Sequence, residues 1–105
     1  MIYHSNMVGY KKLYLKSLGY TPSDFVCCEI SGSPAIDIHH IIGRGKLGDD
    51  RIENLMALTR ENHIKYGDKK KYMKYLFMAH RDFLEANGVK FDHNFFNEMI
   101  KKYDD

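Results

Sequence analysis

A short run of alternating residues from 35 to 42 is the feature that most constrains how this chain can fold. Ile36 and Ile38 stand on one side of the run, and Asp37 and His39 stand on the other. That is the two-residue period of a β-strand. A glycine-rich stretch with several charged residues follows directly, and this composition predicts an exposed loop. Since exposed loops beside rigid elements often carry function, we expect the end of this strand to matter chemically.

A second short strand and a helix are predicted after the loop. Residues 55–58 are all apolar, Thr59 is a natural helix N-cap, and residues 60–66 are predicted to be helical. His63 falls in the first turn of that helix. The order strand, loop, strand, helix would therefore bring His63 back beside His39.

The rest of the chain is predicted to be helical apart from one further strand. Apolar positions at helical spacing predict helices over 7–18 and, with a break near residue 87, over 69–103. Residues 25–29 are short, aromatic and β-branched, and they could pair as a hairpin with the alternating run. No repeat or linker divides the chain, so we predict one α+β domain, 1–105. In the predicted helix that begins at residue 69, the apolar side chains expected to face the core are Tyr72, Tyr75, Leu76, Ala79, Phe83 and Ala86.

Composition predicts a globular protein of a reducing compartment. The net charge is only +2, and the two cysteines, Cys27 and Cys28, are adjacent, so they cannot readily bridge each other. No apolar run has the length of a membrane span, and the first residues lack the pattern of a signal peptide. We therefore expect a cytoplasmic protein without a membrane partner. A lysine-rich stretch at 65–74 either meets phosphates or is a solvated helix face.

Three histidines and one asparagine carry the chemistry that the sequence suggests. They are His39, His40, Asn54 and His63. Neutral imidazole is the commonest metal ligand and accepts a proton near neutral pH. Taken alone, adjacent histidines could be ordinary strand residues. Together with the asparagine and the third histidine they favour a metal-dependent hydrolytic site, in which two ligands leave metal positions open for water and a phosphate oxygen.

These residues and their neighbours form a pattern known from one nuclease family. Its members are Asp37-Ile38-His39-His40-Ile41, then Asn54-Leu55, then His63. The pattern resembles the HNH endonucleases, whose core is the ββα-metal, or His-Me, finger. The resemblance covers roughly residues 25–66 and implies that finger, made of a β-hairpin, a glycine loop, a short strand and a helix, flanked by N-terminal and C-terminal helices.

The resemblance implies a role for each residue of the pattern. His39 and His63 would bind one divalent metal, which could be Mg²⁺, Mn²⁺, Ni²⁺ or Zn²⁺. His40 would be the general base that activates water against the scissile phosphate. Asn54 would brace the loop and so orient the base. The implied activity is metal-dependent hydrolysis of DNA phosphodiester bonds.

Four charged residues near the pattern are expected to support the site, and each also has an alternative interpretation. Asp37 is expected to orient a ligand histidine, with direct metal binding or a plain surface position as the alternatives. Arg44, Lys46 and Arg60 are expected to contact DNA phosphates, and the alternative is that they are solvated charges.

Many HNH proteins carry a separate structural zinc ion, which we do not expect in this chain. Many relatives hold that ion with two Cys-x-x-Cys pairs, which here correspond to Cys28 with Ser31 and to Thr59 with Asn62. One thiolate cannot hold a structural zinc. We therefore predict no structural zinc and an inert, buried Cys28.

The resemblance suggests a partner and leaves two alternatives to an autonomous nuclease. The partner would be DNA, by expectation double-stranded, in a bacterial or phage-infected cell. Small stand-alone proteins of this type resemble phage or mobile-element nucleases. The first alternative is a DNA-binding or assembly module that acts through a protein partner, for example in phage genome packaging. The second is a toxin-like nuclease with a cognate inhibitor.

Overall fold

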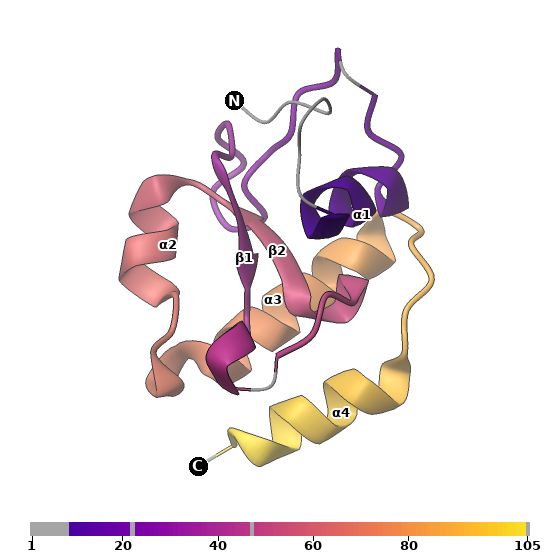
Figure 1. Ribbon diagram of the computed structural model, residues 1–105. Coiled ribbons are helices and arrows are strands. Elements are labelled where there is room, and N and C mark those ends of the chain that lie inside the picture. The colour runs from indigo at the N-terminus through magenta and orange to yellow at the C-terminus, as the bar shows by residue number, and fades with distance from the viewer. Residues whose placement is uncertain (1–8, 22, 47, 105) are drawn as a thin grey trace.

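The computed structural model of the chain describes residues 9–21, 23–46 and 48–104 (Figure 1). It is a mixed α+β structure with a two-stranded antiparallel sheet. The helices are α1 (Gly9–Ser17), α2 (Arg60–Tyr66), α3 (Met73–Ala86) and α4 (His93–Lys102). The strands are β1 (Asp37–His40) and β2 (Leu55–Leu58), and the short 3-10 turns are η1 (Arg44–Lys46), η2 (Ile52–Asn54) and η3 (Lys70–Tyr72).

The sheet pairs the alternating run with the apolar run that follows the glycine loop. Asp37 lies opposite Leu58, and His40 lies opposite Leu55. Every residue of β2 is buried, because the core covers both of its faces. The loop that joins the strands contains η1 and η2 and returns the chain directly to β2. The antiparallel pairing therefore places the end of β1 beside the start of β2.

The predicted strand at 25–29 is wrong, and β1 is shorter than the predicted run of 35–42. The two segments are joined by an isolated bridge between Cys27 and Pro34 and by a hydrogen bond from the Ala35 backbone N–H to the Val26 carbonyl at 2.9 Å, and they form no ladder. The Glu29 backbone N–H instead donates to the Ala57 carbonyl at 2.9 Å, so this segment turns toward β2. The fully buried run of β2 offers a strand partner more apolar surface than a segment whose Phe25 stays 59 % exposed.

The flanking helices lie close to the predicted ranges. α1 begins at Gly9, and residues 7 and 8 of the predicted helix lie outside the described residues. Residues 70–86 divide into η3 and α3. The Asp92 side chain accepts from the Phe95 backbone N–H at 3.2 Å, which caps α4. No helix within the described ranges has the length and hydropathy needed to cross a membrane.

The buried face of α3 differs from the predicted face. Tyr75 is 44 % exposed, and a histidine lies on the side that is turned to the core. Apolar spacing alone could not place that histidine, because its burial depends on partners far away in the sequence. The buried residues of α3 are Met73, Leu76, Phe77, His80 and Leu84.

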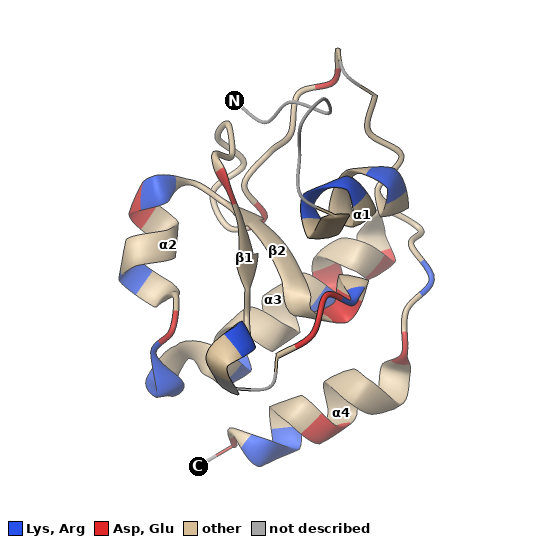
Figure 2. Ribbon diagram, viewed as in Figure 1, with Lys and Arg blue, Asp and Glu red and all other residues tan. Residues whose placement is uncertain are grey.

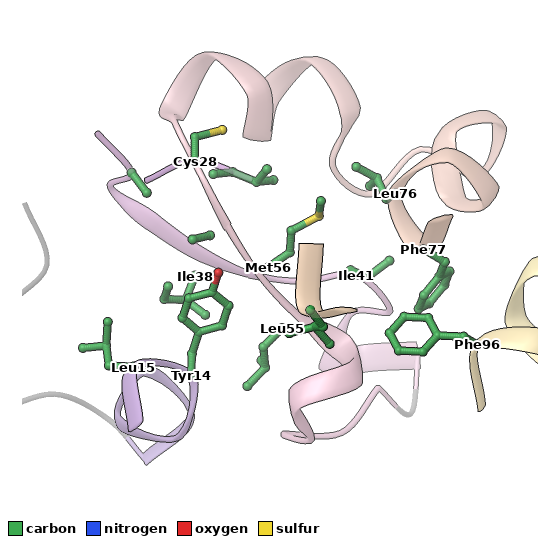
Figure 3. Close-up of a cluster of buried hydrophobic side chains, with 14 of the residues drawn as sticks. Tyr14, Leu15, Cys28, Ile38, Ile41, Leu55, Met56, Leu76, Phe77 and Phe96 are labelled. Atoms are coloured by element: carbon green, nitrogen blue, oxygen red, sulfur yellow. The ribbon is translucent and has the colours of Figure 1, made fainter. Parts of the chain in front are cut away.

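The core lies between the sheet, α1, α3 and α4 (Figure 3). Tyr14 from α1, Met56 from β2, Phe77 from α3 and Phe96 from α4 are all fully buried in it. Contacts from helices at both ends of the chain thus enclose the central sheet. The three helices α1, α3 and α4 pack against the strands in this core.

A polar network lies inside this apolar core. His80 Nδ1 lies 2.7 Å from Glu29 Oε1, and its Nε2 donates to the Ile52 carbonyl at 2.7 Å. The Tyr14 hydroxyl donates to Glu29 Oε2 at 2.6 Å. Burial acts to lower the pKa of His80, but the charge and hydrogen bond of Glu29 outweigh burial, and that pKa is raised. The network joins α1, the segment before β1, η2 and α3.

Candidate metal centre

The residues of the candidate site come from the end of β1, from α2 and from the turn after α2. His39 and His40 are the last residues of β1. Thr59 Oγ1 accepts a hydrogen bond from the Asn62 backbone N–H at 3.1 Å, so α2 begins where the sequence predicted. The helix brings the ring centroid of His63 to 4.5 Å from that of His39.

Three side chains of the described residues offer metal-binding atoms near one point. They are His39, His63 and Asp68, and one donor atom of each lies within 4.8 Å of the others. His39 is only 4 % exposed. Its Nε2 is, over the described ranges, the one buried side-chain nitrogen or oxygen without a hydrogen-bond partner. An unpaired buried polar atom costs about 1–3 kcal/mol, so a ligand there would remove a penalty incurred in folding.

The donor set and the state of His39 both fit a divalent ion. Burial lowers the pKa of His39 to about 4, and the charge of His63 acts in the same direction. The ring of His39 is therefore neutral at physiological pH, as a metal ligand must be. Two imidazoles and one carboxylate suit first-row ions such as Zn²⁺, Ni²⁺ and Mn²⁺. The residues thus fit the metal that the motif implies.

Asp37 orients one of these rings. Its Oδ2 lies 2.8 Å from His63 Nδ1, and its two oxygens also accept from Arg60 Nη2 and Nε at 3.0 and 2.9 Å. Burial acts to raise the pKa of Asp37, but the hydrogen bonds from Arg60 and His63 outweigh it, and the pKa is lowered. An ionised Asp37 accepts a hydrogen bond from the protonated Nδ1 of His63, which leaves Nε2 of that ring for a ligand.

His40 opens into the same pocket as the metal-binding group. The pocket has a volume of about 320 Å³ and lies at the end of β1. His39, His40, His63 and Asp68 line it together. A molecule bound there would meet the donor group and the ring of His40 at once.

Asn54 fixes the backbone at the rim of this pocket. Its side chain is fully buried. Its Oδ1 accepts from the Ile42 backbone N–H at 2.8 Å, and its Nδ2 donates to the carbonyls of Ile42 and Asp49 at 3.0 and 2.9 Å. One side chain thus ties both ends of the loop that follows His40. That geometry suits the bracing role expected of an asparagine at this place.

Asp68, which lies within the lysine-rich stretch at 65–74, was not predicted as a ligand. Asp68 adopts φ of 58°, a left-handed conformation that aspartate tolerates better than most residues. Gly67 precedes it and is buried against the two histidines: an added Cβ would lie 2.7 Å from His63 Cδ2 and 3.3 Å from His39 Cε1. The Gly-Asp pair directly after the helix that carries His63 was the available signal.

Both arginines expected to contact phosphate are paired with carboxylates. Arg60 binds Asp37, and Arg44 Nη2 lies 2.9 and 2.8 Å from the two oxygens of Asp50. The side chain of Lys46 lies outside the part of the chain that the structure describes. Their contact with DNA stays a prediction, and in the structure Arg44 and Arg60 position acids of the site.

The four positions compared with zinc-binding pairs do lie together. Cys28 is buried, and its Sγ lies 3.3 Å from Asn62 Oδ1, which also accepts from Thr59 Oγ1 at 3.1 Å. Burial acts to raise the pKa of Cys28, but hydrogen bonds from Ser31 and nearby backbone outweigh it, and the pKa is lowered. A hydrogen-bonded cluster thus joins the turn before β1 to the start of α2.

No protein-family model, curated protein or solved structure matches this chain. The likeness of residues 25–66 to the HNH endonucleases rests on the motif alone. What the site can do follows from its own geometry.

Proposed function

We propose that this chain is a metal-dependent endonuclease of the HNH type, which hydrolyses DNA phosphodiester bonds. One observation carries the proposal: the unpaired, buried Nε2 of His39 lies beside the donor atoms of His63 and Asp68, in a pocket that His40 also lines. In the same proposal β1, β2 and α2 form a ββα-metal finger.

His39, His63 and Asp68 would hold one divalent ion. Three protein ligands leave coordination positions free for water and a phosphate oxygen. When bound, the ion supplies stabilisation of the negative charge that develops on the phosphate and on the leaving oxygen. Asp37 supports this arrangement, since it holds His63 with Nδ1 protonated and Nε2 available.

His40 would act as the general base. The ring takes a proton from a water molecule, and the water oxygen attacks phosphorus. The bond from phosphorus to the leaving sugar oxygen breaks, and that oxygen takes a proton from solvent. A positioned general base typically contributes about 10²–10⁴-fold to the rate. Asn54 contributes by fixing the backbone that follows His40.

Lysines near the pocket are better placed than the paired arginines to meet DNA phosphates. Figure 2 shows basic segments on α2, η3, η1 and the end of α4. Lys70 and Lys102 line a second pocket of about 320 Å³, which shares Gly43 and Asp68 with the histidine pocket. Among the described residues neither lysine pairs with a carboxylate. The substrate we propose is double-stranded DNA, in the cytoplasm of a bacterial or phage-infected cell.

Nicking of supercoiled plasmid tests the proposal. Purified protein is incubated with plasmid and, separately, with Mg²⁺, Mn²⁺, Ni²⁺ or Zn²⁺, and EDTA is the blank. We expect cleavage with at least one ion and at least about 100-fold slower cleavage by His40→Ala, because the general base is lost. His93→Ala is the matched control, since it removes an exposed histidine outside the site. An inactive wild-type protein under all four ions would contradict autonomous nuclease activity.

A second candidate function is a DNA-binding or assembly module that acts through a protein partner. Lys70 and Lys102 favour it, because they line the second pocket without a carboxylate partner among the described residues and could hold DNA phosphates without cleavage chemistry. This candidate predicts a mobility shift of duplex DNA that His40→Ala leaves unchanged, without cleavage under any ion.

A further inference from the structure

Three residues outside the histidine–asparagine pattern surround His40. Asp50 Oδ1 lies 2.7 Å from His40 Nε2. Tyr10 of α1 places its ring centroid 4.5 Å from that of His40. Arg44, from the loop after β1, lines the same pocket. The ring of His40 is therefore held at one edge by a carboxylate and on one side by an aromatic ring.

The three residues around His40 also contact one another. Arg44 Nε and Nη2 donate to Asp50 Oδ1 at 3.1 and 2.9 Å, and Nη2 reaches Oδ2 at 2.8 Å. The guanidinium carbon of Arg44 lies 4.8 Å from the ring centroid of Tyr10. Tyr10, His40, Asp50 and Arg44 thus form a closed ring of contacts that joins α1, β1 and the glycine loop. Such closure limits the rotation of each side chain.

The charge of Asp50 decides which nitrogen of His40 carries the proton. The carboxylate of Asp50 accepts hydrogen bonds from Nε and Nη2 of Arg44, and an ionised carboxylate only accepts. Nε2 of a neutral His40 must then carry the hydrogen. Within the described ranges no residue donates a hydrogen bond to Nδ1. The free lone pair is therefore on Nδ1.

We propose that Asp50 is the positioning residue of His40, and that its contact with Nε2 assigns Nδ1 as the atom that takes the proton from water. Arg44 then serves to fix Asp50, and Tyr10 gives the N-terminal helix a part in the site. This inference rests on the proposed nuclease function for its kinetic consequence, but the hydrogen bond can be tested without activity. The proton moves from water to Nδ1, and the Nε2 proton stays on the ring.

The first test is nitrogen-15 NMR of the histidine rings in the full chain with Zn²⁺, a diamagnetic ion, at the pH of the cleavage assay. His40 signals are assigned by their loss in His40→Ala. We expect a protonated Nε2 and an unprotonated Nδ1, with a low-field Nε2 proton that disappears in Asp50→Ala. Asp49→Ala, which removes the neighbouring exposed carboxylate, should leave that proton unchanged. A protonated Nδ1 in the wild-type protein, or an Nε2 proton signal unchanged in Asp50→Ala, would overturn the proposal.

The second test separates kcat from KM with a short DNA duplex. We expect Asp50→Ala to lower kcat about 10- to 100-fold with KM unchanged, a loss typical of removing a partner that orients an imidazole. Asp49→Ala should match wild type. Faster cleavage or a lower KM in Asp50→Ala would mean that Asp50 occupies the place of a substrate phosphate, which contradicts the proposal. If wild type does not cleave, the nuclease function fails, and the NMR measurement alone decides the role of Asp50.

Discussion

Two buried histidines of this molecule have opposite environments. His80 is enclosed in the core with both ring nitrogens hydrogen-bonded, one to Glu29 and one to the Ile52 carbonyl. His39 is almost as deeply buried, yet its Nε2 has no partner among the described residues. The pKa of His80 is raised, whereas burial lowers the pKa of His39 to about 4. A buried imidazole with both nitrogens paired stabilises the fold, whereas one with a free nitrogen is available to a ligand.

The largest expected effect on the free energy of unfolding comes from removing the core histidine, His80. His80→Ala leaves Glu29 buried without its opposite charge, and breaking a buried pair in this way costs about 3–5 kcal/mol. We expect that loss in the free energy of unfolding, measured by urea denaturation. The exposed His93→Ala should stay within about 0.5 kcal/mol of wild type. A loss below about 1 kcal/mol in His80→Ala would remove the distinction between the two buried histidines.

Raising the pH should lower the free energy of unfolding by less than removing His80 does. A neutral His80 loses its charge but can keep its hydrogen bond to Ile52. The pKa of His80 is raised above its ordinary value of 6.5, so above pH 6.5 the folded state binds more protons than the unfolded state. The contribution is fully present below pH 6.5 and is lost as pH rises through the raised pKa. Urea denaturation at a series of pH values should show stability falling over that window in wild type. The same series with His80→Ala should lack this fall; a parallel slope in both proteins would assign it to another group.

The smallest expected effect is an increase in the free energy of unfolding, from a substitution of His39. His39→Leu replaces the unpaired nitrogen by an apolar side chain, so in EDTA we expect the free energy of unfolding to rise by about 1–3 kcal/mol. Under the proposed function the same variant should also lose metal-dependent cleavage, because one of the three proposed ligands is gone. Thermal unfolding with and without Zn²⁺ checks both consequences, since an ion that binds only the folded state raises its stability. A destabilised His39→Leu in EDTA would show that the Nε2 atom is paired in solution.

Local signals in the sequence predicted the local structure well. Thr59 caps α2 as predicted, because a cap needs only the next few residues. The strand at 25–29 was wrong because strand pairing is a choice between distant partners, and β2 offered the more apolar one. Local sequence could not predict the burial of His80 for the same reason, since its partner Glu29 lies far from it in the sequence.

The candidate site shows the same difference between what the sequence could predict and what depends on tertiary contacts. The sequence brought His39 and His63 together through the order of elements, and their rings do meet. Asp68 was missed because its approach depends on a left-handed residue after α2. The pairing of Arg44 with Asp50 was missed because both lie in a loop, where side-chain contacts follow no period.

The closeness of Gly67 to the two histidines restricts how this site could change over evolutionary time. An added Cβ would lie 2.5 Å from the His63 carbonyl oxygen as well as against both rings. The wall between His39 and His63 is therefore main chain and cannot be lined with new side chains. Selectivity among metal ions or substrates would have to change through Asp68 and the outer rim of the pocket, while the position between the imidazoles stays closed to variation.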